Sequence, residues 1–196
     1  MSANGNGHKK VLGIVGSPRR GGNTDILVDE ILRGAEEAGA EVEKVILNKL
    51  DIAPCLACDS CGKTGKCAQR DDMQSLVEKM DSSQVMVLGT PLYWYGPSAQ
   101  IKTFIDRWYG ATHEMTFEGR CVILAIAWGQ PDAHAARHME GMFKGILGFL
   151  NMEHFATVLA PGVFQQGDVR EHSEVLEEAQ RVGREVINER IENKHG

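Results

Sequence analysis

Residues 10–24 read KVLGIVGSPRRGGNT, a short apolar run that ends in glycine and passes into a polar, glycine-rich loop. A continuous apolar run of this length is typical of a strand buried on both faces. Residues 24–38 follow with Leu27, Ile31 and Ala35 spaced four apart, which predicts a helix with one buried face. The stretch therefore predicts a strand, a loop and a helix, the repeating unit of parallel α/β sheets.

The same alternation continues along the chain. The pattern predicts further strands over 41–47, 84–90, 120–128 and 154–159, and further helices over 73–80, 101–108, 134–150 and 171–193. The strand at 41–47 is the least apolar and is expected at an edge. Five strands alternating with five helices predict one α/β domain, spanning 10–196, with a parallel sheet covered on both faces.

Composition narrows the functional classes. The 196-residue chain carries a net charge of −6, which argues against a general nucleic-acid or anionic-membrane binder. The sequence contains no run of 18 or more apolar residues, so no transmembrane helix is expected. Residues 1–9 are polar and basic, unlike a secretory signal, and are expected to form a disordered leader. Four of the five cysteines fall within residues 55–67, which favours a reducing, cytoplasmic setting over a secreted disulfide scaffold.

In parallel sheets of this kind, ligands bind beyond the carboxyl ends of the strands. The loop after the first strand offers hydroxyl and amide groups from Ser17, Asn23 and Thr24, a charge from Arg19 or Arg20, and close backbone approach at its glycines. It opens a helix, whose N-terminus favours an anion. It lacks the lysine of nucleotide-binding P-loops and the Gly-x-Gly-x-x-Gly fingerprint. Two interpretations of this loop remain: a phosphate-binding loop, or an ordinary turn in which Thr24 caps the helix.

Two further loops carry unusual sequences. Residues 90–98, TPLYWYGPS, place three successive aromatic rings between prolines and a glycine. Such rings can stack on a flat ligand, or pack in the core or an oligomer interface. The loop after the fourth strand, 127–130, is expected to complete the pocket with Trp128 and Gly129.

The clustered cysteines are Cys55, Cys58, Cys61 and Cys67, in the spacing C-x2-C-x2-C-x5-C. Structural zinc sites usually pair two separated knuckles, so one compact loop fits zinc poorly. Closely spaced thiolates suit a cubane, in which each sulfur takes a different iron. The alternative is a loop of structural or redox-active free thiols. Cys121 lies inside an apolar strand and is expected in the core.

Three segments carry a resemblance to known proteins. Residues 16–24 resemble the Gly-Ser-x-Arg-x-x-Gly-Asn-Thr loop of the NADPH-dependent FMN reductase family, and 102–107, KTFIDR, resemble that family's Lys-x-Phe-x-Asp-Arg helix. The cysteine loop, with DDM at 71–73 after it, resembles the iron–sulfur flavoproteins of the same superfamily. The resemblance implies a flavodoxin-like three-layer α/β sandwich with a five-stranded parallel sheet.

It also implies the roles of particular residues. The FMN phosphate would be held by Ser17, Arg19, Gly22, Asn23 and Thr24. The flavin ring would contact Pro91, Leu92, Tyr93, Trp94, Tyr95 and Gly96. The loop with Trp128 and Gly129 would complete the cofactor pocket. Trp128 departs from the small polar residue common in relatives, and either covering the flavin or narrowing the substrate space is open for it. A [4Fe–4S] cluster would be held by Cys55, Cys58, Cys61 and Cys67, at the same strand-end rim as the flavin.

Two hypotheses follow. The first is an iron–sulfur flavoprotein that passes electrons between a cluster, FMN and a small-molecule or protein partner, as a homodimer or homotetramer. The second is an NAD(P)H-dependent FMN or quinone-type reductase that uses FMN alone. In both, the flavin supplies the chemistry. A non-enzymatic protein on the same scaffold is disfavoured, because all three ligand loops are furnished with ligand-binding residue types.

Overall fold

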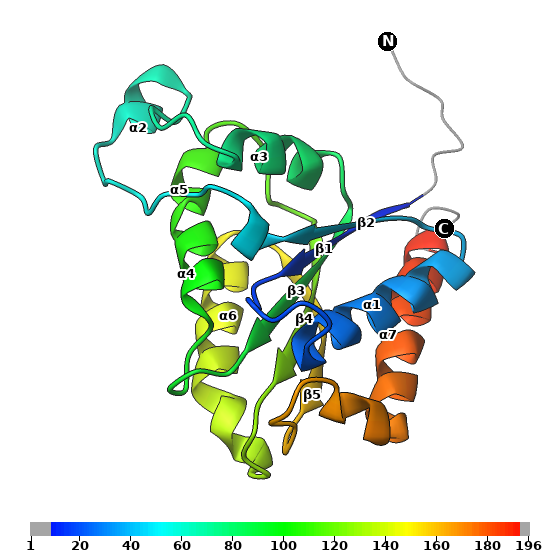
Figure 1. Ribbon diagram of the computed structural model, residues 1–196. Coiled ribbons are helices and arrows are strands. Elements are labelled where there is room, and N and C mark those ends of the chain that lie inside the picture. Colours follow the sequence, from blue (N-terminus) through cyan, green and yellow to red (C-terminus); the bar gives the residue numbers. More distant parts are fainter. Residues whose placement is uncertain (1–8, 193–196) are drawn as a thin grey trace.

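The computed structural model describes residues 9–192, with side chains described to residue 190. The described chain forms one parallel sheet in the order β2-β1-β3-β4-β5, shown in Figure 1. The strands are β1 (Lys10–Val15), β2 (Glu41–Ile46), β3 (Val85–Pro91), β4 (Cys121–Ala127) and β5 (Glu153–Ala160). This order is that of flavodoxin-like, doubly wound folds. The fold expected from the sequence is confirmed, as is the edge position of β2.

Helices cover both faces of the sheet (Figure 1). The helices of the described chain are α1 (Asn23–Glu37), α2 (Ser60–Thr64), α3 (Met73–Asp81), α4 (Ala99–Asp106), α5 (Trp108–Ala111), α6 (Arg137–Phe149) and α7 (Ser173–Glu192). Short 3-10 helices are η1 (Leu47–Lys49), η2 (Ala133–Ala136) and η3 (Asp168–Glu171). Helices α1 and α7 pack on one face, and α3 to α6 on the other. The arrangement is a three-layer sandwich.

Side chains along the central strands alternate between two hydrophobic cores, one on each face of the sheet. In β1, Leu12 and Ile14 join the core under α3 to α6, whereas Val11 and Val15 join the core under α1 and α7. Successive side chains of a strand point to opposite faces, so a strand covered on both sides must be apolar throughout. All seven residues of β3 and of β4 are buried, as this requires.

Helices α1 and α7 approach each other closely because glycines lie at their contact. A Cβ at Gly34 would lie 2.0 Å from the carbonyl oxygen of Gln180. A Cβ at Gly183 would lie 2.0 Å from the carbonyl oxygen of Ile31. The backbones are therefore nearer than any side chain at these two positions would allow.

The structure differs from the sequence expectations mainly at helix boundaries. The helix expected over 101–108 is divided at Arg107 into α4 and α5, and the one expected from residue 134 begins with η2. Helix α2, inside the cysteine segment, was not expected. Residues 1–8 of the expected leader, and residue 193 of the last expected helix, lie outside the described residues. None of the helices described is long and apolar enough to cross a membrane.

Candidate functional site

The loops after β1 and β3 diverge at the point where the strand order reverses. The chain leaves β1 toward β2 on one side and returns to β3 on the other, which opens a crevice between the two loops. The backbone N–H of Gly16 donates to the carbonyl of Gly89 at 2.8 Å, and the Ser98 hydroxyl donates to the carbonyl of Gly16 at 2.7 Å. These bonds hold the first and third loops in a fixed relation.

A cleft of about 180 Å³ lies in this crevice. It brings together residues from four loops that are far apart in the sequence. Its lining comprises Ser17, Arg19, Asn23, Thr24, Pro91, Leu92, Tyr93, Ala127, Trp128, Gly129, Val163 and Phe164. Nine of the thirteen cofactor-binding residues expected from the sequence are in this set, so the three loops do converge.

The first turn of α1 presents free donors beside this cleft. Gly22 is the N-cap and supplies no side chain to cap the helix. Among the described residues, the backbone N–H groups of Asn23, Thr24 and Asp25 have no hydrogen-bond partner. Such groups carry the positive end of the helix dipole and favour a bound anion. Ser17 and Thr24 are both buried and add hydroxyl groups next to them.

The side chain of Asn23 has a structural task. Its Nδ2 donates to the carbonyls of Val163 at 3.2 Å and Gln165 at 2.8 Å. Its Oδ1 accepts from the backbone N–H groups of Gly167 at 3.0 Å and Val169 at 3.2 Å. The amide is thus fully engaged in fixing the loop between β5 and α7. Asn23 can offer a ligand its backbone N–H rather than its side chain.

Arg19 and Gly22 shape the turn. The backbone N–H of Arg19 donates to Ser17 Oγ at 3.2 Å, and its guanidinium donates to the carbonyl of Phe164 at 3.1 Å. A Cβ at Gly22 would lie 2.9 Å from the carbonyl oxygen of Arg19, so the turn admits only glycine without a shift. The Arg19 side chain is exposed at the mouth of the cleft.

A second cleft, of about 330 Å³, continues from the first and shares with it Leu92, Trp128, Gly129 and Phe164. It is additionally lined by Trp94, Tyr95, Gln130 and Ala135. A Cβ at Gly129 would lie 2.6 Å from the Phe164 ring, which explains the glycine there. One end of the combined space therefore presents hydroxyl and backbone N–H donors, and the other presents aromatic side chains.

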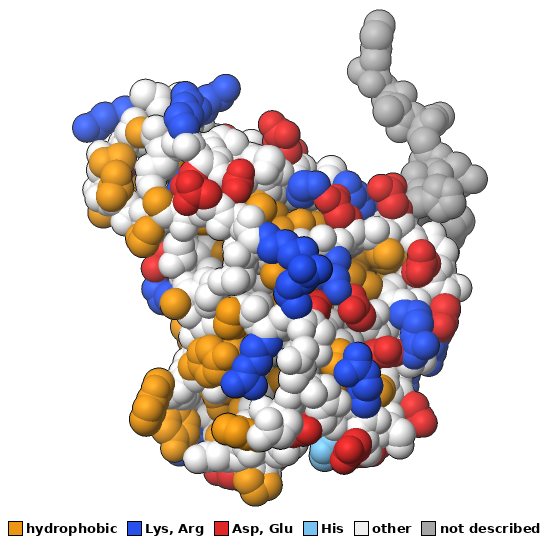
Figure 2. All heavy atoms as spheres, in the orientation of Figure 1, with side chains coloured by type: hydrophobic (Ala, Val, Ile, Leu, Met, Phe, Trp, Pro, Cys, Tyr) orange, Lys and Arg blue, Asp and Glu red, His pale blue; other side chains and the backbone are white. Residues whose placement is uncertain are grey.

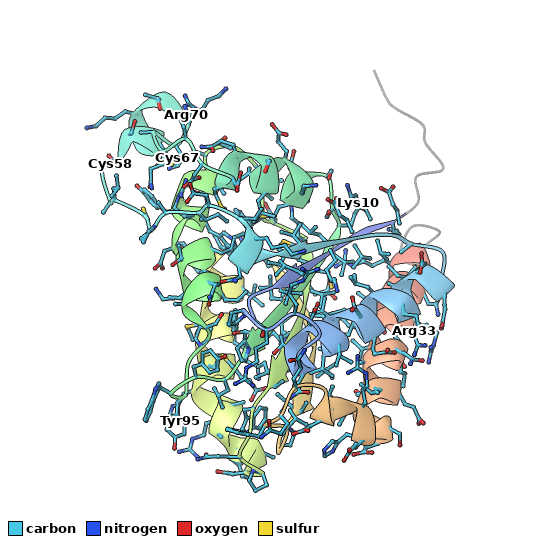
Figure 3. The ribbon with its side chains drawn as sticks, in the orientation of Figure 1. Lys10, Arg33, Cys58, Cys67, Arg70 and Tyr95 are labelled. Carbon is cyan, nitrogen blue, oxygen red and sulfur yellow. The ribbon has the colours of Figure 1, made fainter. Side chains whose placement is uncertain are left out.

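The aromatic loop forms a tight turn. The backbone N–H and carbonyl groups of Tyr93 and Gly96 bond to each other at 2.9 and 3.0 Å. The two residues between them, Trp94 and Tyr95, have φ values of 49° and 64°, in the left-handed region. Their side chains are 98% and 57% exposed, and the rings of Tyr95 and His138 lie nearly perpendicular, with centroids 6.5 Å apart. Figure 3 shows Tyr95 projecting from the molecule.

The cysteine segment, which we define as residues 53–71, projects from the domain and contains α2 (Figure 1). Cys55 and Cys58 are exposed, Cys61 is buried, and Cys67 is half-buried. Four thiols on one segment fit a cubane in kind and number, and the N–H of Ala57 already donates to Cys55 Sγ at 3.4 Å. Within residues 9–190, however, no three His, Cys, Asp or Glu side chains are gathered closely enough to hold one metal ion.

The cysteine segment and the clefts lie at opposite ends of the α4–α5 pair. Figure 3 places Cys58 and Cys67 beyond α5, and Tyr95 beside the start of α4. Figure 2 shows basic side chains at the outer tip of the segment and apolar side chains near the turn at the far end of this face. The expectation that the cluster lies at the same strand-end rim as the flavin stays a prediction, since within one chain the segment extends away from the clefts, toward the far end of α4 and α5.

Sequence reasoning missed the loop after β5. Val163 and Phe164 line the first cleft, and Asn23 holds this loop against α1. The rule that ligands bind beyond the carboxyl ends of parallel strands applies to the fifth strand as well. The glycines at 162 and 167, both at positive φ, mark a structured turn there.

Comparison with known proteins agrees with this fold and cleft. Residues 9–162 match the family of NADPH-dependent FMN reductases. The chain belongs to this family. An iron–sulfur flavoprotein of Archaeoglobus fulgidus is 36% identical over 138 residues, covering 69% of this chain and 62% of its own. One from Methanocaldococcus jannaschii is 43% identical over 98 residues, covering 50% of this chain and 51% of its own. The chain thus spans about half to three-fifths of these relatives.

Other family relatives resemble the chain over more of its length. A Bacillus subtilis protein named as an NAD(P)H-dependent FMN-containing oxidoreductase is 26% identical over 181 residues, covering 88% of this chain and 96% of its own. Among solved structures, an NAD(P)H:quinone oxidoreductase from Methanothermobacter marburgensis superposes with a TM-score of 0.75 at 17% identity, covering 92% of this chain and all of that one. This structural likeness confirms the fold.

Proposed function

We propose that the chain binds FMN, with its phosphate at the N-terminus of α1 and its ring toward the aromatic cleft. The observation that carries this proposal is the set of unpaired backbone N–H groups of Asn23, Thr24 and Asp25 beside the first cleft. Membership of an FMN reductase family supports the choice of ligand. Ser17, Thr24 and Arg19 would add polar contacts to the phosphate, and Leu92, Tyr93 and Trp128 would flank the ring.

When bound, FMN takes up electrons from a donor such as NAD(P)H and passes them to an acceptor. The role of the protein is to hold the flavin, to limit its contact with water and to leave one side open to the donor. The buried Trp128 and the Gly129–Phe164 contact form a firm wall, whereas Trp94 and Tyr95 stand at an exposed rim. We infer an NAD(P)H-dependent oxidoreductase with a small-molecule or protein acceptor.

The phosphate assignment is tested with FMN and riboflavin. If the α1 N-terminus holds the phosphate, wild type binds FMN at least about 100-fold more tightly than riboflavin. Ser17→Asp places a carboxylate in a site for one anion and should remove most of this preference. Ser75→Asp, which adds the same charge at an exposed position on α3, is the control. Equal affinity of wild type for the two flavins contradicts the assignment.

We further infer that Cys55, Cys58, Cys61 and Cys67 hold a [4Fe–4S] cluster. The donor set and the iron–sulfur flavoprotein relatives support this. The second candidate, a reductase with FMN alone, is favoured by the separation of the four thiols within the described residues. Anaerobic reconstitution decides: about four irons and four sulfides per chain, lost in Cys58→Ser and Cys61→Ser with FMN retained, supports the cluster. No iron uptake supports the second candidate.

The exposed rings point to self-association. Trp94, Tyr95 and Phe164 cluster at the rim of the second cleft, and Phe149 is 87% exposed on α6. Exposed apolar groups of this size usually meet a ligand or another subunit. We infer a homodimer or homotetramer, in which a second copy would also shorten the path between cysteine segment and flavin. Light scattering of wild type and Trp94→Ala measures the assembly.

The grouped thiols favour a cytoplasmic location.

A further inference from the structure

Arg107 connects the domain to the cysteine segment. Its side chain is almost completely buried between α4 and α5. Its Nη1 donates to the carbonyl of Ala53 at 2.8 Å and to Asp71 Oδ2 at 2.5 Å, and its Nη2 donates to Asp71 Oδ1 at 3.1 Å and to Cys67 Sγ at 3.5 Å. One guanidinium therefore bridges both ends of the segment and reaches one of its sulfurs.

Asp71 completes this connection. Its carboxylate accepts from Arg107 and from the backbone N–H groups of Ala53 and Met73, each at 3.1 Å. Both carboxylate oxygens thus accept hydrogen bonds, and the donors flank the segment at both of its ends. A buried pair with complete hydrogen bonding keeps a defined geometry, whereas loss of either partner strands a charge in a low-dielectric site.

The remaining contacts converge on the same part of the fold. The Tyr109 hydroxyl donates to Asp59 Oδ1 at 2.9 Å, and the N–H of Cys67 donates to Glu114 Oε1 at 3.2 Å. A Cβ at Gly110 would lie 3.5 Å from that of Cys67. Apart from bonds to the adjoining α3, every hydrogen bond described between the cysteine segment and the rest of residues 9–192 goes to residues 107–114.

We propose that Arg107 is a positioning residue that closes the cysteine segment into a loop and sets a fixed positive charge against Cys67. The planar fork of arginine is needed, because one group must reach Ala53, Asp71 and Cys67 together. The proposal has a structural part, which is independent of any cluster. It also has an electrostatic part, which rests on the proposed cluster: a cation bonded to a ligand sulfur favours the reduced, more negative state.

The structural part is tested by amide hydrogen exchange. Arg107→Lys keeps the charge but lacks the fork, and Arg107→Gln lacks both. We expect exchange over residues 55–70 to rise at least about 10-fold in both variants, with exchange in α1 and β3 unchanged. The control is Lys102→Gln, which removes one positive charge from the exposed face of α4, the helix that ends just before Arg107. Wild-type protection over 55–70 in Arg107→Lys overturns the proposal.

The electrostatic part is tested by redox titration of the reconstituted protein. Arg107→Gln should give a more negative midpoint potential for the cluster than wild type, and Lys102→Gln should change it less. An unchanged potential in Arg107→Gln overturns this part. If wild type takes up no cluster, the proposed cluster fails on its own, while the exchange measurement still decides whether Arg107 positions the segment.

Discussion

At the scale of single residues, the Trp94–Tyr95 turn is the most unusual feature. Two-residue turns with positive φ at both positions usually carry Asn-Gly, because these residues adopt the left-handed region at low cost. Here both positions carry large aromatic side chains that gain little from burial. Strained backbone of this kind persists mainly where function maintains it. The turn therefore lowers the stability of the fold while it holds two aromatic rings at the rim of the second cleft.

The double variant Trp94→Asn/Tyr95→Gly should therefore be more stable than wild type. Relief of the backbone strain predicts a gain of roughly 1–2 kcal/mol in the free energy of unfolding. Urea denaturation of the flavin-free protein measures it. Phe149→Ala is the control, because it removes an exposed ring from a helical position without relieving strain. A double variant no more stable than this control would show that the turn is not strained.

Cys121 shows how burial changes thiol chemistry. It is completely buried in β4, as expected from the sequence, and burial raises the pKa of its thiol to about 11. Since the thiolate is the nucleophile, Cys121 should resist alkylation in the folded, cluster-free protein at neutral pH. Cys55 and Cys58 are exposed and should react first. Mass spectrometry after timed labelling reports the order; early labelling of Cys121 contradicts this prediction.

At the scale of elements, the contact between α1 and α7 depends on glycine. Gly34→Ala or Gly183→Ala would push a methyl group against the backbone of the partner helix, which cannot move aside as a side chain can. Each should lower the free energy of unfolding by at least about 2 kcal/mol.

The matched control is Gly141→Ala on α6, an exposed helical position with open space around it. There, alanine should raise stability by about 0.5–1 kcal/mol, because glycine has more conformational freedom to lose. Thermal or urea unfolding compares the three variants. Similar effects at all three positions would mean that helix propensity, rather than the close contact, governs them.

The Asp71–Arg107 pair links α3, the cysteine segment and α5, and it predicts a pH dependence. Burial opposes ionisation of Asp71, but hydrogen bonds from Arg107, Ala53 and Met73 outweigh it and lower the pKa of the carboxyl below its ordinary value of 3.8. The stabilisation is complete above that ordinary value and is lost as the pH falls through the lowered pKa of the folded protein. Acidification below about pH 4 should therefore weaken the attachment of the segment.

In this range the Asp71→Asn variant should show a shallower acid dependence of stability than wild type. Asp106→Asn serves as the control, since Asp106 pairs with Lys102 on the exposed face of α4 and such pairs contribute little. Urea titrations at several pH values measure the slopes. Parallel slopes for wild type and Asp71→Asn would contradict the assigned role of this carboxylate.

At the scale of the whole molecule, local pattern was enough to predict the sheet and three of the four loops that line the clefts. Short, continuously apolar runs such as those of β1, β3 and β4 are typical of strands in a sheet covered on both faces. Long-range pairings could not be predicted. The amide of Asn23 is typical of a ligand group in its loop, yet its partners lie some 140 positions away. The path of the cysteine segment depends on Arg107, whose partners no spacing rule reveals.

The four bonds of Asn23 also bear on the order of events during synthesis. The loop proposed to carry the phosphate contacts is synthesised well before the segment that fixes it, because the carbonyl and N–H groups that bond to Asn23 belong to residues 163–169. Until those residues have left the exit tunnel, Asn23 is free and the wall formed by Val163 and Phe164 does not exist. A nascent chain can therefore form β1 and α1 before the cleft is complete, and we expect it to bind the proposed flavin only after residues 163–169 have been synthesised and have folded.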